Sequence, residues 1–105
     1  MHFEETSINV SGYDAHVWHG GKGYPILMMH GAGPGTSSAG NFAKVRIPMS
    51  KNFNVFGTDM IGFGKSAQKL EAPFFDYDLW LQQMQAVLDS IPAEKVGLVG
   101  HSISA

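Results

Sequence analysis

The most reactive pattern in the sequence is a serine near its carboxyl end, within the run Gly100-His-Ser102-Ile-Ser104. The apolar and glycine residues before it predict a buried strand that leads directly into this run. A G-x-S-x-small pattern after a strand is typical of a nucleophile elbow, a turn so tight that the residues two before and two after the serine must be small. Ser102 is therefore the candidate nucleophile, and the alternative is a strand that simply ends near a serine.

A second pattern, His30-Gly-Ala-Gly-Pro-Gly35, is rich in glycine and follows another apolar run. A loop of this kind between a strand and a helix is a place where backbone N–H groups can hold a negatively charged oxygen. Ala32 and Gly33 are the expected donors, and the N–H of Ile103 is expected to complete this oxyanion hole. A plain strand-to-helix turn and a phosphate-binding loop remain as alternatives. The G-x-G-P-G spacing does not fit a dinucleotide-binding fingerprint.

A third pattern, Asp59-Met-Ile-Gly62-Phe-Gly64-Lys-Ser66, has the glycines and polar residues of a structured loop. Asp59 is expected to be structural, because its carboxylate can accept hydrogen bonds from the amides of its own loop. His30 is expected to orient the glycine-rich loop. The histidines near the N-terminus are expected at or near the surface and are not candidates for a metal site: His2, His16 and His19.

The rest of the sequence predicts the strands and helices that position these patterns. Strands are predicted over 3–10, 13–18, 25–29, 53–56 and 95–100. The first two should form a hairpin through Ser11-Gly12, and the third should be buried on both faces. A helix from about residue 39 should pack Phe42, Val45 and Met49, and a helix over 76–91 should pack Trp80, Met84, Val87, Leu88 and Ile91. This order is an α/β fold, a hairpin followed by βαβαβ, with the three patterns at the carboxyl ends of the strands.

Composition narrows the class of protein. The formal net charge is −2, with no cluster of lysine and arginine, which argues against nucleic acid and anionic lipid as partners. Cysteine is absent, so no disulfide or cysteine metal site can form. No secretory leader or membrane-spanning run is recognisable, and the cytoplasm is the expected location. The 105 residues are expected to form one partial domain, because a complete fold of this kind needs a chain about twice as long.

Together the three patterns resemble the N-terminal part of the α/β-hydrolase superfamily. Within it, the glycine-rich run followed by Gly40-Asn41-Phe42 is similar to the meta-cleavage-product hydrolases, which cut a carbon–carbon bond in vinylogous 1,5-diketones formed by ring-opening of catechols. The resemblance implies that Ser102 is the nucleophile or activates water, and that Asn41 lies near the dienol carboxylate of the substrate. It also implies that the acid and the histidine of the catalytic triad follow Ala105, so residues 1–105 alone should be inactive.

The sequence leaves several functions open. The leading one is hydrolysis of a C–C or ester bond in a small carbonyl compound, with water as the second substrate and no cofactor. His101 also suits esterases, so both bond types stay open. Epoxide hydrolases and haloalkane dehalogenases share the glycine loops but carry aspartate at the elbow, and Ser102 disfavours both. The alternatives are a non-catalytic receptor or ligand-binding module and a biologically silent piece of an incomplete gene. The oligomeric state stays open.

Overall fold

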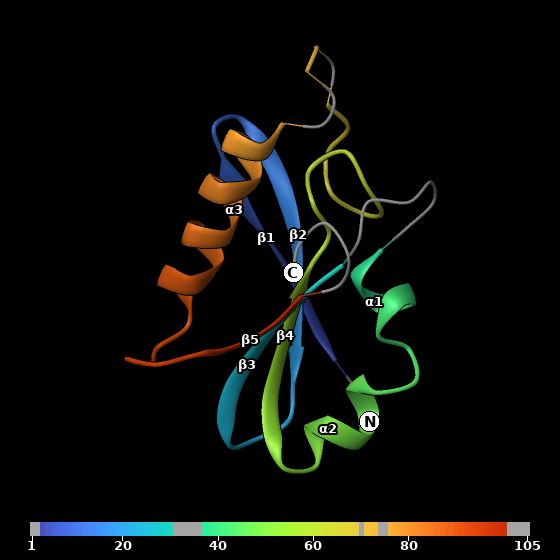
Figure 1. Cartoon of the computed structure of the whole chain (residues 1–105), viewed down its shortest axis with the longest axis vertical. Coiled ribbons are helices and arrows are strands. Elements are labelled where there is room, and N and C mark those ends of the chain that lie inside the picture. The colour runs from blue at the N-terminus through green and yellow to red at the C-terminus, as the bar shows by residue number, and fades with distance from the viewer. Residues whose placement is uncertain (1–2, 31–36, 70, 74–75, 101–105) are drawn as a thin grey trace.

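The computed structural model describes residues 3–30, 37–69, 71–73 and 76–100 of the chain. They form a five-stranded sheet with helices on both of its faces (Figure 1). The strands are β1 (Glu4–Val10), β2 (Tyr13–Gly20), β3 (Tyr24–Met29), β4 (Phe53–Thr58) and β5 (Gly97–Gly100). The helices are α1 (Ser38–Asn41), α2 (Arg46–Ser50) and α3 (Tyr77–Ser90). This element order confirms the predicted α/β class, a hairpin followed by βαβαβ.

The sheet is mixed, with the strand order β1-β2-β4-β3-β5. The predicted hairpin is confirmed, since β1 and β2 pair antiparallel from Glu4 opposite His19 to Val10 opposite Tyr13. Both residues of its turn have positive φ, 50° at Ser11 and 89° at Gly12, as a two-residue hairpin turn that follows the strand twist requires. The strands β4, β3 and β5 run parallel to one another.

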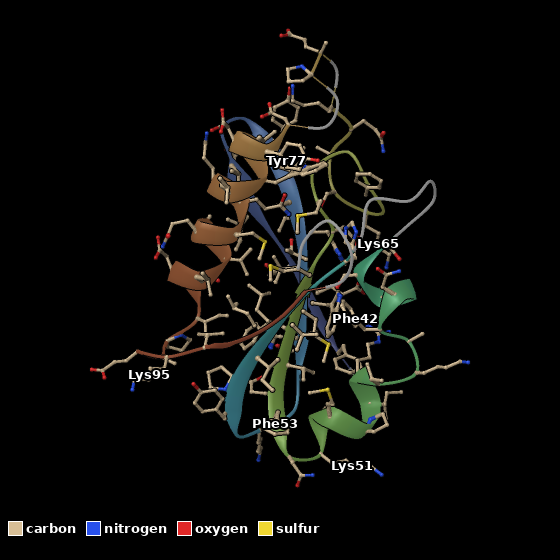
Figure 2. All side chains as sticks on the ribbon, in the orientation of Figure 1. Phe42, Lys51, Phe53, Lys65, Tyr77 and Lys95 are labelled. Atoms are coloured by element: carbon tan, nitrogen blue, oxygen red, sulfur yellow. The ribbon has the colours of Figure 1, made fainter. Side chains whose placement is uncertain are left out.

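The core has one layer on each face of the sheet (Figure 2). On the α3 side, one buried cluster is Val17, Leu27, Phe56, Val87 and Ile91, and a second is Val10, Ala15, Met60, Ile61, Leu79 and Trp80. On the side of α1 and α2, they are Trp18, Ile26, Met28, Phe42 and Val55. Because side chains alternate along a strand, β3 contributes to both layers, which confirms that it is buried on both faces.

The helix predicted from residue 39 is wrong in one respect, because the chain forms two short helices there instead of one. Phe42 is buried and Met49 half-buried as expected, but Val45 is 44% exposed. Val45 stands at the N-cap of α2, after the turn that separates the two helices, so its side chain no longer follows the face that carries Phe42. Pro48 is tolerated as the third residue of α2, where the backbone N–H has no partner within the helix.

The second predicted helix is confirmed as α3. Its N-cap is Asp76, whose carboxylate accepts a hydrogen bond from the Leu79 N–H at 3.1 Å, and Pro92 follows its end. Trp80, Val87 and Ile91 are buried, whereas Met84 and Leu88 are half-buried. No helix within the described residues has the length and apolar character needed to cross a bilayer.

Gly57 offers a direct test of the packing between the sheet and α1. A Cβ at this position would overlap the ring carbons of Trp18, which is 1% exposed, and the hydroxyl of Ser38. We therefore expect Gly57→Ala to lower the free energy of unfolding by about 3 kcal/mol, measured by urea denaturation of the whole protein. The control is Gly97→Ala, whose Cβ would meet Ile26 at an ordinary 3.4 Å and should cost less than about 1 kcal/mol. Equal losses for the two variants would contradict this account.

Candidate active site

The three parallel strands end in register at one edge of the sheet. Met29 at the end of β3 pairs with Thr58 on one side and with Gly100 on the other. Neighbouring strands are about 4.8 Å apart, so the segments that follow β3, β4 and β5 start side by side. The three sequence patterns, which begin at Gly100, His30 and Asp59, were predicted to lie close together. This is confirmed for the ends of the three strands that precede them. Ligands bind at this edge in open α/β sheets.

Most of the predicted site residues lie outside the described residues: Ser102, Ile103, Ala32 and Gly33. Their roles as nucleophile and oxyanion donors stay predictions. Asn41 is described and is the last residue of α1, where its backbone N–H donates to the Ser37 carbonyl at 2.9 Å. The residue is exposed, and its contact with substrate also stays a prediction.

Asp59 holds the loop after β4 against the start of α1. The residue is buried, with 3% of its surface exposed. Its carboxylate accepts two backbone hydrogen bonds, from the N–H of Ser38 at 2.7 Å and from the N–H of Lys65 at 2.9 Å. The bond to Lys65 confirms the predicted role within its own loop, and the bond to Ser38 was not predicted. Gly64 is needed beside it, because a Cβ there would overlap the carboxylate and its φ is 52°.

His30 is fixed by the same segment. Its ring is buried at 1% exposure, and Nε2 accepts a hydrogen bond from the Met60 N–H at 2.8 Å, so this nitrogen carries no proton. This bond ties His30 to the loop after β4, and its predicted role in orienting the glycine-rich loop stays a prediction, because residues 31–36 lie outside the described residues. His30 is the first residue of the glycine-rich run and Ser38 lies three residues after its last, Gly35. The adjacent residues Met60 and Asp59 therefore bond the two flanks of this run.

Gln83 supports this arrangement from α3 and was missed from the sequence. Its amide is fully buried and donates to Thr58 Oγ1 and to the Asp59 carbonyl, both at 2.8 Å. Its carbonyl oxygen accepts from the Ile61 N–H at 2.9 Å. One sequence signal could have identified Gln83: it lies three residues after Trp80, on the apolar face of the helix. A polar side chain buried there must form hydrogen bonds.

A cluster of charged groups lies on the other side of Asp59, toward the hairpin. The Glu5 carboxylate contacts His16 Nε2 at 2.7 Å and Lys65 Nζ at 2.8 Å. Hydrogen bonds from Lys65 and then His16 hold the pKa of the Glu5 carboxyl below its usual range. His16 is half-buried, as predicted, and Ser66 bonds its backbone N–H at 2.8 Å. Among the described residues, no set of three histidine or acidic side chains is arranged to hold a metal ion.

Comparison with known proteins adds a family to this geometry. Residues 24–103 match the family model described as alpha/beta hydrolase fold. The chain is 34% identical over 95 residues to a 2-hydroxymuconate semialdehyde hydrolase of Pseudomonas sp. (strain CF600), covering 90% of the chain and 33% of the relative. It is 30% identical over 104 residues to a 2-hydroxy-6-oxo-6-(2'-aminophenyl)hexa-2,4-dienoic acid hydrolase of Metapseudomonas resinovorans, covering 96% of the chain and 34% of the relative.

The structural comparison agrees. The meta-cleavage product hydrolase from Pseudomonas fluorescens IP01 superposes with a TM-score of 0.82 at 28% identity, covering 94% of the chain and 36% of that structure. The resemblance to meta-cleavage-product hydrolases is thus confirmed as a similarity of both sequence and fold. The chain spans about a third of the length of the proteins it matches.

Proposed function

The chain belongs to the alpha/beta hydrolase fold family, and from this premise we propose that the whole protein carrying it is a serine hydrolase acting on a small carbonyl compound. The observation that carries the proposal is the pairing of Met29 with Gly100. Because of this pairing, the glycine-rich run and the serine-bearing run begin at the ends of two adjacent strands. A nucleophile and the donors of an oxyanion hole need this proximity.

In the proposed reaction, Ser102 attacks the substrate carbonyl or activates a water molecule that does so. The proton of its hydroxyl passes to a histidine base, which the chain order of this fold places after Ala105 together with the acid. The negative charge that develops on the carbonyl oxygen is held by the N–H of Ile103 and of Ala32 or Gly33. Each such donor contributes about 2.7–4 kcal/mol to transition-state stabilisation.

We further propose that the substrate is a 2-hydroxy-6-oxo-dienoate and that the bond broken is C–C. Support comes from the similar proteins, whose names specify a 2-hydroxymuconate semialdehyde and a 2-hydroxy-6-oxo-hexadienoic acid as substrates. Asn41 is proposed to face the dienol carboxylate from the end of α1. Hydrolysis of an ester by the same residues is the alternative.

A serine-directed fluorophosphonate reagent tests whether the site is catalytic. The whole protein should be labelled stoichiometrically, and mass spectrometry of the digested protein should place the adduct on Ser102 rather than Ser104. Activated serines react because the neighbouring base removes their proton. A protein that is folded by circular dichroism but remains unlabelled would be a non-catalytic binding module, and the hydrolase proposal would then be wrong.

A further inference from the structure

The backbone of residues 59–61, directly after β4, is held by three separate parts of the fold. The Asp59 N–H donates to a carbonyl of β2 at 3.2 Å, and the Met60 N–H donates to His30 Nε2 at the end of β3 at 2.8 Å. The Ile61 N–H donates to the Gln83 side chain of α3 at 2.9 Å. Three successive amide groups are therefore bonded to three different elements, and these bonds together fix the path of the segment.

Gln83 binds this segment with both ends of its amide. Besides accepting from the Ile61 N–H, it donates to the Asp59 carbonyl and to Thr58 Oγ1, both at 2.8 Å. All four of these residues are buried, so solvent does not compete for the three bonds. An apolar side chain of similar size would fill the same space in the core but would leave the Ile61 N–H without its acceptor. The amide is therefore needed for the segment rather than for the packing of α3.

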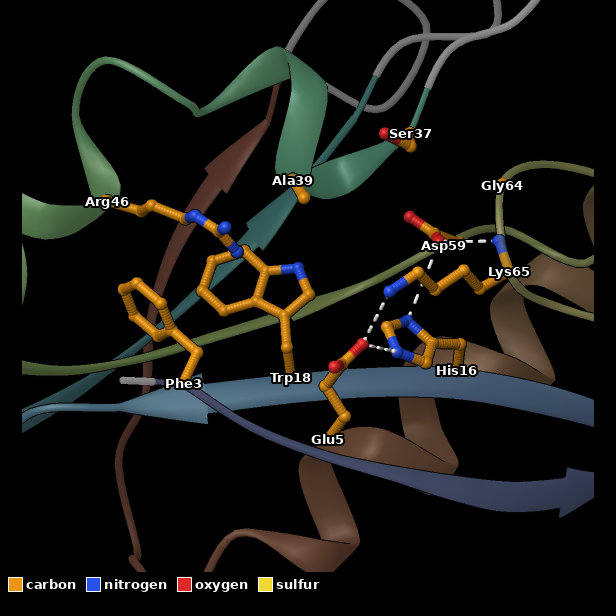
Figure 3. Close-up of a pocket in the computed structure, with 10 residues that line it drawn as sticks. All are labelled: Phe3, Glu5, His16, Trp18, Ser37, Ala39, Arg46, Asp59, Gly64 and Lys65. Atoms are coloured by element: carbon orange, nitrogen blue, oxygen red, sulfur yellow. Dashed lines mark hydrogen bonds and ion pairs between the residues drawn. The ribbon is translucent and has the colours of Figure 1, made fainter. Parts of the chain in front are cut away.

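The same segment holds both flanks of the glycine-rich run. Met60 bonds the buried ring of His30, and the Asp59 carboxylate accepts from the N–H of Ser38, which is also buried. Figure 3 shows Asp59 near the start of α1, where Ser37 is labelled. In Figure 1, α3 and α1 lie on opposite sides of the sheet. The bonds of Gln83 thus connect a helix on one face to the run and to the helix on the other face.

We propose that Gln83 is a positioning residue of the reaction. Through Asp59 and Met60, its amide holds the two flanks of the glycine-rich run so that the proposed oxyanion donors are in place. The inference rests on the proposed function, which makes this run part of an oxyanion hole. A misplacement of about 1 Å in a catalytic site can lower the rate about 10²-fold, so a residue that does not touch the substrate can control kcat.

Gln83→Met in the whole protein tests the proposal, because it removes the three bonds and keeps a side chain of similar length. We expect kcat for dienoate hydrolysis to fall at least about tenfold and KM to change less than about threefold, since the oxyanion donors act mainly in the transition state. Val87→Ala is the control for lost stability: it removes buried volume from the same helix, where Val87 packs with Leu27 and Phe56, and kcat should stay within about twofold. Gln85→Met makes the same exchange at an exposed position of α3 and should change neither kcat nor stability.

Amide hydrogen exchange, followed by NMR, tests the positioning without an activity assay. Gln83→Met should speed exchange of the Met60 and Ser38 N–H groups at least about tenfold more than Val87→Ala does, because the segment opens locally while the rest of the fold stays closed. If the two variants speed this exchange alike, Gln83 only contributes to stability and the inference is overturned.

The two assays separate the possible failures. An unaltered protein that folds but hydrolyses neither a dienoate nor an ester contradicts the proposed function. A working hydrolase in which Gln83→Met and Val87→Ala lose kcat alike contradicts only the role of Gln83. If Gln83→Met does not fold, Thr58→Val takes its place, because it removes one acceptor of Gln83. It should lower kcat at least about threefold, and an unchanged kcat would overturn the inference.

Discussion

Replacing Ser102 with alanine in the whole protein is expected to lower kcat for dienoate hydrolysis by about 10⁴- to 10⁶-fold. The variant loses the hydroxyl that attacks or activates water, and the remaining backbone donors can supply only a residual acceleration of about 10³–10⁴ over the uncatalysed reaction. KM should change little, because the hydroxyl contributes mainly in the transition state. The measurement is steady-state kinetics on a 2-hydroxy-6-oxo-dienoate, followed by the loss of its absorbance.

The matched control is Ser104→Ala. It removes a hydroxyl two residues away and keeps the small side chain that a tight elbow needs, so kcat should stay within about threefold of the unaltered protein. Circular dichroism should show that both variants fold. A Ser102→Ala variant that keeps more than a tenth of the activity would exclude this serine as the nucleophile.

Asp59→Ala is expected to lower the free energy of unfolding by about 2–5 kcal/mol. The substitution leaves the backbone N–H groups of Ser38 and Lys65 without their acceptor, and each unsatisfied buried donor costs about 1–3 kcal/mol. Urea denaturation of the whole protein measures the loss. Asp76→Ala is the control, since it removes one N-cap bond at the start of α3 and an ion pair with Lys69 at 3.5 Å, and should cost about 1–2 kcal/mol.

The same variant should also lose activity at temperatures where it remains folded. Asp59 bonds Ser38, three residues after the end of the glycine-rich run at Gly35, so its removal should misplace the proposed oxyanion donors and lower kcat at least about tenfold, with a smaller change in KM. Asp76→Ala should leave kcat unchanged. If Asp59→Ala is destabilised but fully active, Asp59 serves folding alone and has no part in positioning the site.

Elements with strong periodicity could be predicted from the sequence. The hairpin follows from alternating residues around Ser11-Gly12, β3 from an uninterrupted apolar run, and α3 from apolar residues at helical spacing before Pro92. The loop role of Asp59 also followed from its sequence context. In each case the information lies within a few neighbouring residues, which is why local reasoning was sufficient.

The remaining features depend on contacts between residues far apart in the chain. Gln83 can be buried because it forms hydrogen bonds with Thr58, Asp59 and Ile61. The residues near position 83 in the sequence do not indicate these partners. Val45 is exposed because the chain breaks between α1 and α2 at this point, although the spacing of Phe42, Val45 and Met49 fits one continuous helix. Backbone groups at strand ends are satisfied wherever the tertiary structure supplies a partner, and sequence pattern alone does not specify which side chain that is.

The shared register of β3, β4 and β5 also limits how the lineage of this protein can vary in length. Side chains alternate in direction along a strand, so deleting one residue from β3 would reverse every later side chain and separate His30 from Met60. An equal deletion in β4 would do the same to Asp59. We therefore expect changes in length to be tolerated in loops that set no strand pairing, such as the exposed residues 92–95 between α3 and β5.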